Sequence, residues 1–187
     1  MRFVSRTGLA VAAALLLASS ATAQTKPFSI IGVGYAPEGI NLPAPFGSGV
    51  ATPHWAVGVG NYLGKYSGLG AVQAETFDPD TASGTFGSAV PFEFTGANGD
   101  KLVTTYGRTP TGAPTGTYQI TPQPDGRIVV EFLAEFVPVT DQCTGKFAGV
   151  TGSWLMYAVT EPFVPGDPFG YAWIGSGSLT FPRGRGR

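Results

Sequence analysis

The chain has very little of what builds disulfides and metal centres. Its 187 residues include one cysteine, Cys143, and one histidine, His54. A single thiol cannot form an internal disulfide, so Cys143 is expected to be a small buried side chain, with an intermolecular disulfide as the alternative. Zinc and iron sites need three or four clustered ligands, and these two residues are 89 positions apart. The sequence therefore predicts no metal site and no cofactor.

Charged residues are scarce as well, at 12% of the chain. Arg2 and Arg6 lie in an N-terminal segment that we expect to be cleaved off, as argued below. Without them the chain has nine lysine and arginine residues instead of 11, against 12 acids, which gives a formal charge of about −3. Nucleic-acid binding requires a basic surface that neutralises phosphates. We therefore predict no nucleic-acid partner, and we expect the short basic tail at residues 183–187 to be flexible.

No nucleophile motif accompanies the single histidine. His54 follows Pro53, and no GxSxG sequence or equivalent lies near it. A nucleophilic triad needs a base beside its nucleophile, so His54 is interpreted as an ordinary histidine in a loop or at the start of a strand. The sequence predicts no catalytic residue, assigns no ligand-binding residue, and favours a protein that is not an enzyme.

Two groups of acidic residues could be considered as a calcium site and as a catalytic pair of carboxylates. Glu75, Asp78 and Asp80 lie close together in the sequence, but a calcium site wants six or more oxygens, so a solvated turn is expected. Glu131 and Glu135 share one strand face and would lie about 13 Å apart. That distance exceeds the separation of about 5–9.5 Å in glycosidases, so we expect these two side chains to face solvent.

The N-terminus has the three parts of a secretory signal peptide. Residues 1–6 carry Arg2 and Arg6, residues 8–18 are almost entirely apolar, and Ala21-Thr22-Ala23 matches a small-x-small cleavage site. The apolar run is shorter than the 20 or so residues that a membrane anchor needs. We predict a signal peptide at residues 1–23, a secreted or periplasmic protein, and no membrane span after cleavage.

Glycine, proline and aromatic residues are abundant, with 28 Gly, 16 Pro, 13 Phe, seven Tyr and three Trp. Alternation at residues 127–137 puts Ile128, Val130 and Phe132 on one face and Glu131 on the other. Such alternating runs bounded by Gly and Pro are typical of β-strands. The predicted strands are residues 28–35, 54–66, 69–77, 85–94, 101–106, 115–121, 127–137, 154–163 and 171–181. The fold class is all-β: one antiparallel β-barrel of about eight strands at residues 24–182.

Several segments resemble a known group of small secreted bacterial proteins. They are FTGANGDKL at residues 94–102, Gly116-Thr117-Tyr118, TGKFAGVTGS at residues 144–153, and the expanded segment at residues 49–68. The group's recurrent motifs are "ANGD…L", a Gly-Thr-Phe/Tyr strand and "GTGRFAGATGS". Its members resemble the allene oxide cyclase-like, or calycin-like, eight-stranded barrel. The resemblance implies that fold and, from the plant cyclases, allows a homo-oligomer such as a trimer; it carries no catalytic residue onto this chain.

Five aromatic residues could line a cavity: Trp55, Trp154, Tyr157, Tyr171 and Trp173. Ordinary packing in the core and at its rim is the favoured interpretation, since a barrel of eight strands is just wide enough to fill with side chains or to hold one small ligand. We expect an exported, non-catalytic binding or structural module. The alternatives are a cyclase-like isomerase or a carrier, each with a small apolar, lipid-like ligand inside the barrel, and both require a cavity.

Overall fold

The computed structural model describes residues 23–37, 42–43 and 50–182. The predicted signal peptide up to residue 22 and the basic tail at residues 183–187 lie outside the described residues. The strands are β1 (Gln24–Ala36), β2 (Leu42–Pro43), β3 (Val50–Gly60), β4 (Gly64–Ala74), β5 (Ser83–Gly96), β6 (Lys101–Tyr106), β7 (Gly116–Pro122), β8 (Ile128–Pro138), β9 (Thr151–Thr160) and β10 (Phe169–Phe181). No helix in this part of the chain is both long and apolar enough to cross a bilayer.

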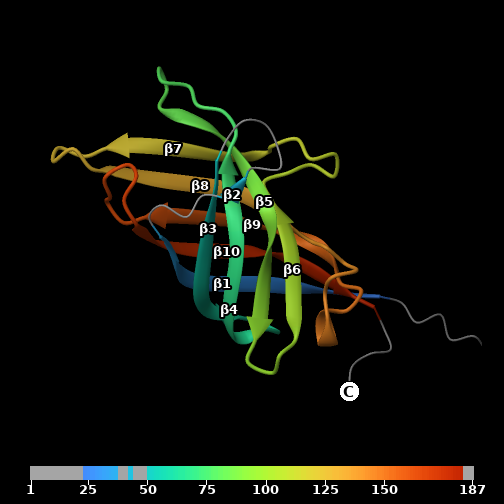
Figure 1. Cartoon of the computed structure of the whole chain (residues 1–187). Helices are drawn as coiled ribbons and strands as arrows, with labels where there is room; N and C mark the ends of the chain where they lie inside the picture. The colour runs from blue at the N-terminus through green and yellow to red at the C-terminus, as the bar shows by residue number, and fades with distance from the viewer. Residues whose placement is uncertain (1–22, 38–41, 44–49, 183–187) are drawn as a thin grey trace, which may run out of the picture.

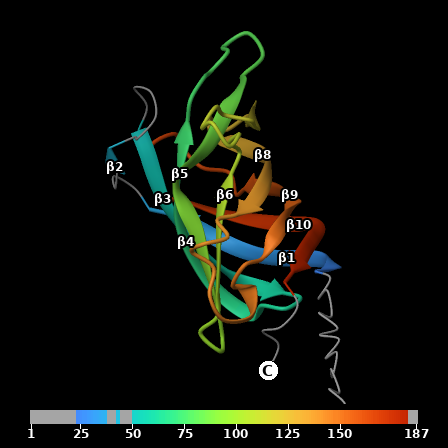
Figure 2. The same cartoon turned by 90° about the vertical axis from the view of Figure 1, so that its right-hand side faces the viewer.

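The strands close into one antiparallel barrel. β1 pairs with β10 on one side and with β3 on the other, which joins the two ends of the strand order. β6 and β7 share a single position, because both lie between β5 and β8, β6 beside Phe92–Thr95 of β5 and β7 beside Ser83–Phe86. The barrel therefore has eight strand positions, which confirms the predicted architecture. In Figures 1 and 2, β3 to β6 cross steeply over β1, β10, β9 and β8.

One predicted strand is in fact a hairpin. Residues 54–66 were expected to be continuous, with the break before residue 69, whereas β3 ends at Gly60 and β4 begins at Gly64. Tyr62 and Gly64 have positive φ angles of 67°. Asn61 fixes the turn to β1, since its side chain accepts the N–H of Ser29 at 2.6 Å and donates to the carbonyl of Pro27 at 3.1 Å. The predicted continuous strand therefore missed a complete chain reversal between β3 and β4.

The FAGVTGS segment leads into β9. Gly145–Phe147 form one turn of 3-10 helix, η1, and β9 starts at Thr151, three residues before the predicted start at residue 154. Gly145, Gly149 and Gly152 have φ angles of 57°, 77° and 107°, a region that favours glycine. The three glycines lead the chain from β8 around the end of the barrel into β9.

Strand glycines make room for the aromatic rings that fill the barrel. A Cβ at Gly58 would lie 2.0 Å from the carbonyl oxygen of Ile31 and 2.5 Å from the hydroxyl of Tyr66, and one at Gly32 would lie 2.2 Å from that same hydroxyl. The Tyr66 hydroxyl uses this space to donate to the Ile31 carbonyl at 3.0 Å. Other rings lie close to glycines in the same way: Phe92 at Gly68 and Gly70, Trp154 at Gly175 and Gly177, and Tyr171 at Gly34.

Gly58→Ala should therefore destabilise the barrel far more than Gly60→Ala on the same strand. The added methyl group would overlap backbone at residue 58, whereas at residue 60 its nearest neighbours are 3.2–3.4 Å away. We expect a loss of about 2–3 kcal/mol for Gly58→Ala and less than about 1 kcal/mol for Gly60→Ala. Urea unfolding followed by tryptophan fluorescence measures both. Equal losses would contradict this account of the glycines.

The outer surface carries a row of apolar side chains. Val59, Ile31, Ile174, Tyr157 and Leu133 are consecutive cross-strand partners on β3, β1, β10, β9 and β8, and each is 42–57% exposed. On these strands both faces are apolar. Alternation alone consequently cannot tell which face points into the barrel.

Candidate functional site

Part of the barrel interior is filled by stacked rings. Phe136 lies nearly parallel to Trp154, with centroids 5.4 Å apart, and nearly parallel to Trp173, with centroids 6.2 Å apart. Phe94 closes the group at 5.8 Å from Trp173 and is fully buried. Offset and tilted rings at these separations attract one another. These rings fill most of the space around them.

A small apolar cavity remains beside the stacked rings. It measures about 60 Å³, is partly open, and is continued by a second space of about 30 Å³ that shares several of its walls. Among the described residues, the polar side chains in the walls of the first space are those of His54, Tyr106 and Tyr171. The remaining walls come from Ala36, Val72, Phe86, Phe132, Phe136, Met156, Ala158 and Phe169. The surface that the cavity presents is therefore apolar, although three residues of its wall carry polar groups.

His54 is held between two tyrosine hydroxyls. Its Nδ1 lies 2.7 Å from the hydroxyl oxygen of Tyr171, and its Nε2 lies 2.8 Å from that of Tyr106. The three residues come from β3, β10 and β6. Their strands are brought together only by barrel closure, since β3 reaches β10 through β1. The Tyr171 hydroxyl also donates to the carbonyl of Trp55 at 3.4 Å.

Burial disfavours the charged form of all three side chains. It lowers the pKa of His54 from 6.5 to about 4. Burial raises the pKa of Tyr106 well above its usual value, with a further increase from nearby Tyr171 and an opposing effect of Arg108. Burial also raises the pKa of Tyr171. A desolvated site disfavours the charged form of each group, so the site offers hydrogen bonds without a formal charge.

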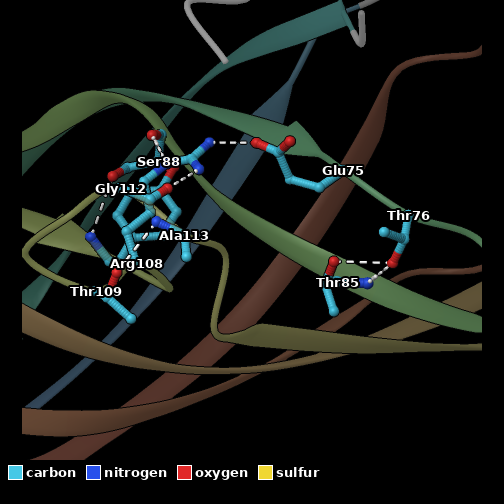
Figure 3. A network of polar contacts seen from close by, with 9 residues as sticks. Glu75, Thr76, Thr85, Ser88, Arg108, Thr109, Gly112 and Ala113 are labelled. Carbon is cyan, nitrogen blue, oxygen red and sulfur yellow. Dashed lines mark hydrogen bonds and ion pairs between the residues drawn. The ribbon is translucent and has the colours of Figure 1, made fainter. Parts of the chain in front are cut away.

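A buried ion pair between Arg108 and Glu75 lies two residues along the chain from Tyr106 (Figure 3). Arg108 contacts the carboxylate of Glu75 at 2.5 Å and donates to the carbonyls of Ser88 at 2.6 Å and Gly112 at 2.9 Å. The hydroxyl of Ser88 accepts the backbone N–H of Tyr106 at 3.2 Å. The arginine side chain is 4% exposed and the glutamate 12%. This network fixes the end of β6, and with it the position of Tyr106.

The acidic residues of the sequence are not gathered into a site. Glu75 pairs with Arg108, while Asp78 accepts the backbone N–H of Asp80 at 2.9 Å within an exposed turn. Glu131 and Glu135 face outward, and Glu131 accepts the hydroxyl of Tyr157 at 2.8 Å. Among the described residues, no three His, Cys, Asp or Glu side chains are placed to hold a metal ion.

The predicted place of His54 was wrong. It lies in the middle of β3 and is half-buried, rather than in a loop or at a strand start. Tyr106 was not singled out, although the alternation of Leu102, Thr104 and Tyr106 in one predicted strand places all three on the same face, which the structure shows to be buried. Pairing His54 with Tyr106 and Tyr171 requires the register of the closed barrel, which the sequence does not display.

The five aromatic residues divide between the inside and the outside. Tyr171 and Trp173 line the cavity and its extension, and Trp154 belongs to the filled core. Trp55 and Tyr157 are 41% and 42% exposed on the outer surface. Cys143 is buried, as predicted, with its sulfur 3.4 Å from the amide nitrogen of Val103.

No protein-family model, curated protein or solved structure matches the chain in the three comparisons made. The resemblance to allene oxide cyclase-like barrels accordingly stays an expectation from the sequence motifs. The closed eight-position barrel agrees with the architecture that this resemblance implies, and the functional assignment has to come from the cavity itself.

Proposed function

We propose that this protein is an exported, non-catalytic binding module of allene oxide cyclase-like type, whose barrel takes a small neutral molecule. The observation that carries the proposal is an apolar cavity in the barrel, with the hydrogen-bonded His54, Tyr106 and Tyr171 among the residues of its wall. Ligand sites are typically apolar pockets with a few well-placed polar groups. A purely structural barrel has no need to bury a histidine between two hydroxyls at the wall of a cavity.

The volume limits the size of the ligand. An apolar cavity of about 150 Å³ holds benzene, and sites for drug-sized ligands span about 300–1,000 Å³. The space of about 60 Å³ therefore fits only a few heavy atoms unless its walls move. Met156 is one of those walls, and methionine side chains adapt easily to irregular shapes. A lipid-sized substrate or cargo does not fit the cavity as it stands, which weighs against the cyclase and carrier alternatives.

Met156 supplies a direct test of binding. It is the only methionine after the predicted cleavage site, so a ¹³C-methyl methionine label gives one cavity signal in the processed protein. Titration with 1-propanol, pyrrole or furan should shift this signal and saturate. Choline and acetate should produce no saturable shift, because the lining side chains carry no charge to offset the desolvation of an ion.

A variant that fills the cavity serves as the control. Ala158 lines both spaces, and Ala158→Leu should abolish the saturable shift while the variant stays folded by circular dichroism. Ala158→Val takes its place if the larger side chain prevents folding. Shifts that do not saturate, or that persist unchanged in the filled variant, would rule out the proposed site.

A further inference from the structure

We propose that an open groove on the outside of the barrel binds a small organic cation, a molecule with an apolar body and a protonated amine. The groove measures about 630 Å³, within the range of about 300–1,000 Å³ for ligand sites. It is formed by the outer faces of β7, β8 and β9, by the start of β5 and by the connection between β4 and β5. This site is additional to the interior cavity, and the proposal does not rest on the function proposed for that cavity.

Large apolar side chains are exposed along this outer groove. Leu133 and Tyr157 are cross-strand partners on β8 and β9, and they are 43% and 42% exposed. Phe77, in the connection between β4 and β5, is 56% exposed. All three line the groove. Aromatic rings attract a cation placed over their faces, so the outer groove offers an apolar molecule a surface that also suits a positive charge.

The charged side chains that line the outer groove are acidic. They are Glu131 and Asp78, and the lining contains no lysine, arginine or histidine among the described residues. The Glu131 carboxylate accepts the hydroxyl of Tyr157 at 2.8 Å through one oxygen, which leaves its other oxygen for a ligand. Hydrogen bonds from the Thr81 side chain and the backbone N–H of Asp80 lower the pKa of Asp78, so this carboxylate is ionised at pH 7. The outer groove is thus complementary to a positive charge.

The larger polar side chains of the lining already give their protons to the protein. The hydroxyl of Tyr118 donates to the carbonyl of Thr76 at 2.8 Å. The side-chain amide of Gln119 donates to the carbonyls of Thr81 and Ala82 at 2.9 and 3.2 Å. Carbonyl oxygens only accept, so the direction of these bonds is fixed. A ligand that brings its own donors, as an ammonium group does, therefore suits the carboxylates better than one that needs donors from the protein.

The same hydrogen bonds hold one wall of the outer groove in place. The connection at residues 75–82 is tied to β7 by Tyr118 and Gln119. It is tied to β5 by Thr76 and Thr85, whose hydroxyls lie 2.8 Å apart, while the Thr76 hydroxyl accepts the N–H of Thr85 at 3.0 Å (Figure 3). A ligand consequently meets a wall that is already formed, and little affinity is lost to ordering it.

Three benzyl compounds of similar size test the preference for positive charge. Benzylammonium, benzyl alcohol and benzoate are titrated at pH 7 and 0.1 M salt into ¹⁵N-labelled processed protein, and the amide signals of residues 117–119 and 131–133 are followed. Benzylammonium should shift these signals with saturation and bind about three- to tenfold more tightly than benzyl alcohol. Benzoate should cause no saturable shift. The Met156 methyl signal should not respond to benzylammonium, because the charged compound stays outside the barrel.

Two glutamates of β8 give a matched pair of variants. Glu131 lines the outer groove, whereas Glu135, on the same exposed face and about 13 Å away, does not. Glu131→Gln should weaken benzylammonium binding about two- to fivefold. Glu135→Gln should change it by less than about 1.5-fold, since charges more than about 10 Å apart are largely screened at 0.1 M salt.

Several results would overturn the cation site. Benzyl alcohol or benzoate binding as tightly as benzylammonium would rule out the charge preference, and equal losses in the two glutamate variants would place the cation outside the groove. A saturable response of Met156 to benzylammonium would show that the compound enters the barrel instead. If none of the three compounds binds, the outer site is lost, while the interior cavity is still judged by its own titration with 1-propanol, pyrrole and furan.

Discussion

Arg108→Met should lower the free energy of unfolding by about 3–5 kcal/mol, the largest loss that we expect from a single polar substitution. The guanidinium is 4% exposed and contacts the carboxylate of Glu75, which is 12% exposed. Removing one member of a buried ion pair leaves an uncompensated charge in a poorly hydrated place. The carbonyls of Ser88 and Gly112 lose donors in the same variant. Urea unfolding at pH 7 provides the measurement.

The chain offers a matched control in its exposed ion pair. Lys101 contacts Glu93 at 2.8 Å, with the two side chains 42% and 43% exposed. Exposed pairs contribute about 0–1 kcal/mol, so Lys101→Met should lower the free energy by less than about 1 kcal/mol. Adding Glu75→Gln to Arg108→Met should restore part of the larger loss, because the orphaned carboxylate is then gone. Equal losses in the two single variants would mean that burial of the Arg108 pair has no energetic consequence.

The turns and strands could be predicted from the sequence because each depends on residues that are close together along the chain. Asn-Gly pairs are typical of hairpin turns, and in Asn98-Gly99-Asp100 the glycine has a φ of 84° between β5 and β6. The alternation at residues 127–137 placed Val130, Ala134 and Phe136 on one face, and all three are buried. Period-two patterning and turn chemistry act over a few residues, so both survive into the closed barrel.

The site was not readable because it depends on closure. His54 meets Tyr171 across 117 residues of chain and Tyr106 across 52. The contact with Tyr171 is fixed by the registers of β3 with β1 and of β1 with β10, and the contact with Tyr106 by the registers from β3 through β4 and β5 to β6. A shift of one residue in any of these registers would turn the side chains to the opposite face. A strand with apolar residues on both faces, such as Val57 and Val59 outside and Ala56 inside, gives no local sign of that register.

Lowering the pH from 7 to 4 should remove about 3 kcal/mol of stability through His54 alone. Its pKa is about 4 in the folded protein and 6.5 in the unfolded chain. Between these values the unfolded chain binds the proton and the folded protein does not, so acid favours unfolding. The contribution is complete above pH 6.5, falls as the pH drops through this window, and changes little further below about pH 4. At about 1.4 kcal/mol per pH unit, the full window of about 2.5 units corresponds to about 3.5 kcal/mol, of which about 3 kcal/mol is lost by pH 4, where His54 in the folded protein is half protonated.

The difference between wild type and His54→Gln isolates this effect from the other acids. Glutamine can donate to one tyrosine hydroxyl and accept from the other, yet it does not titrate. The carboxylates of Asp78 and Asp125, whose pKa values are lowered by hydrogen bonds to Thr81 and to Arg127 respectively, titrate alike in both proteins. We therefore expect the two unfolding curves to converge as the pH falls from 6.5 to 4, by about 3 kcal/mol. Parallel curves across that window would show that His54 accepts a proton as readily in the barrel as in water, and that the chain of hydrogen bonds between Trp55 and Tyr106 does not hold it neutral.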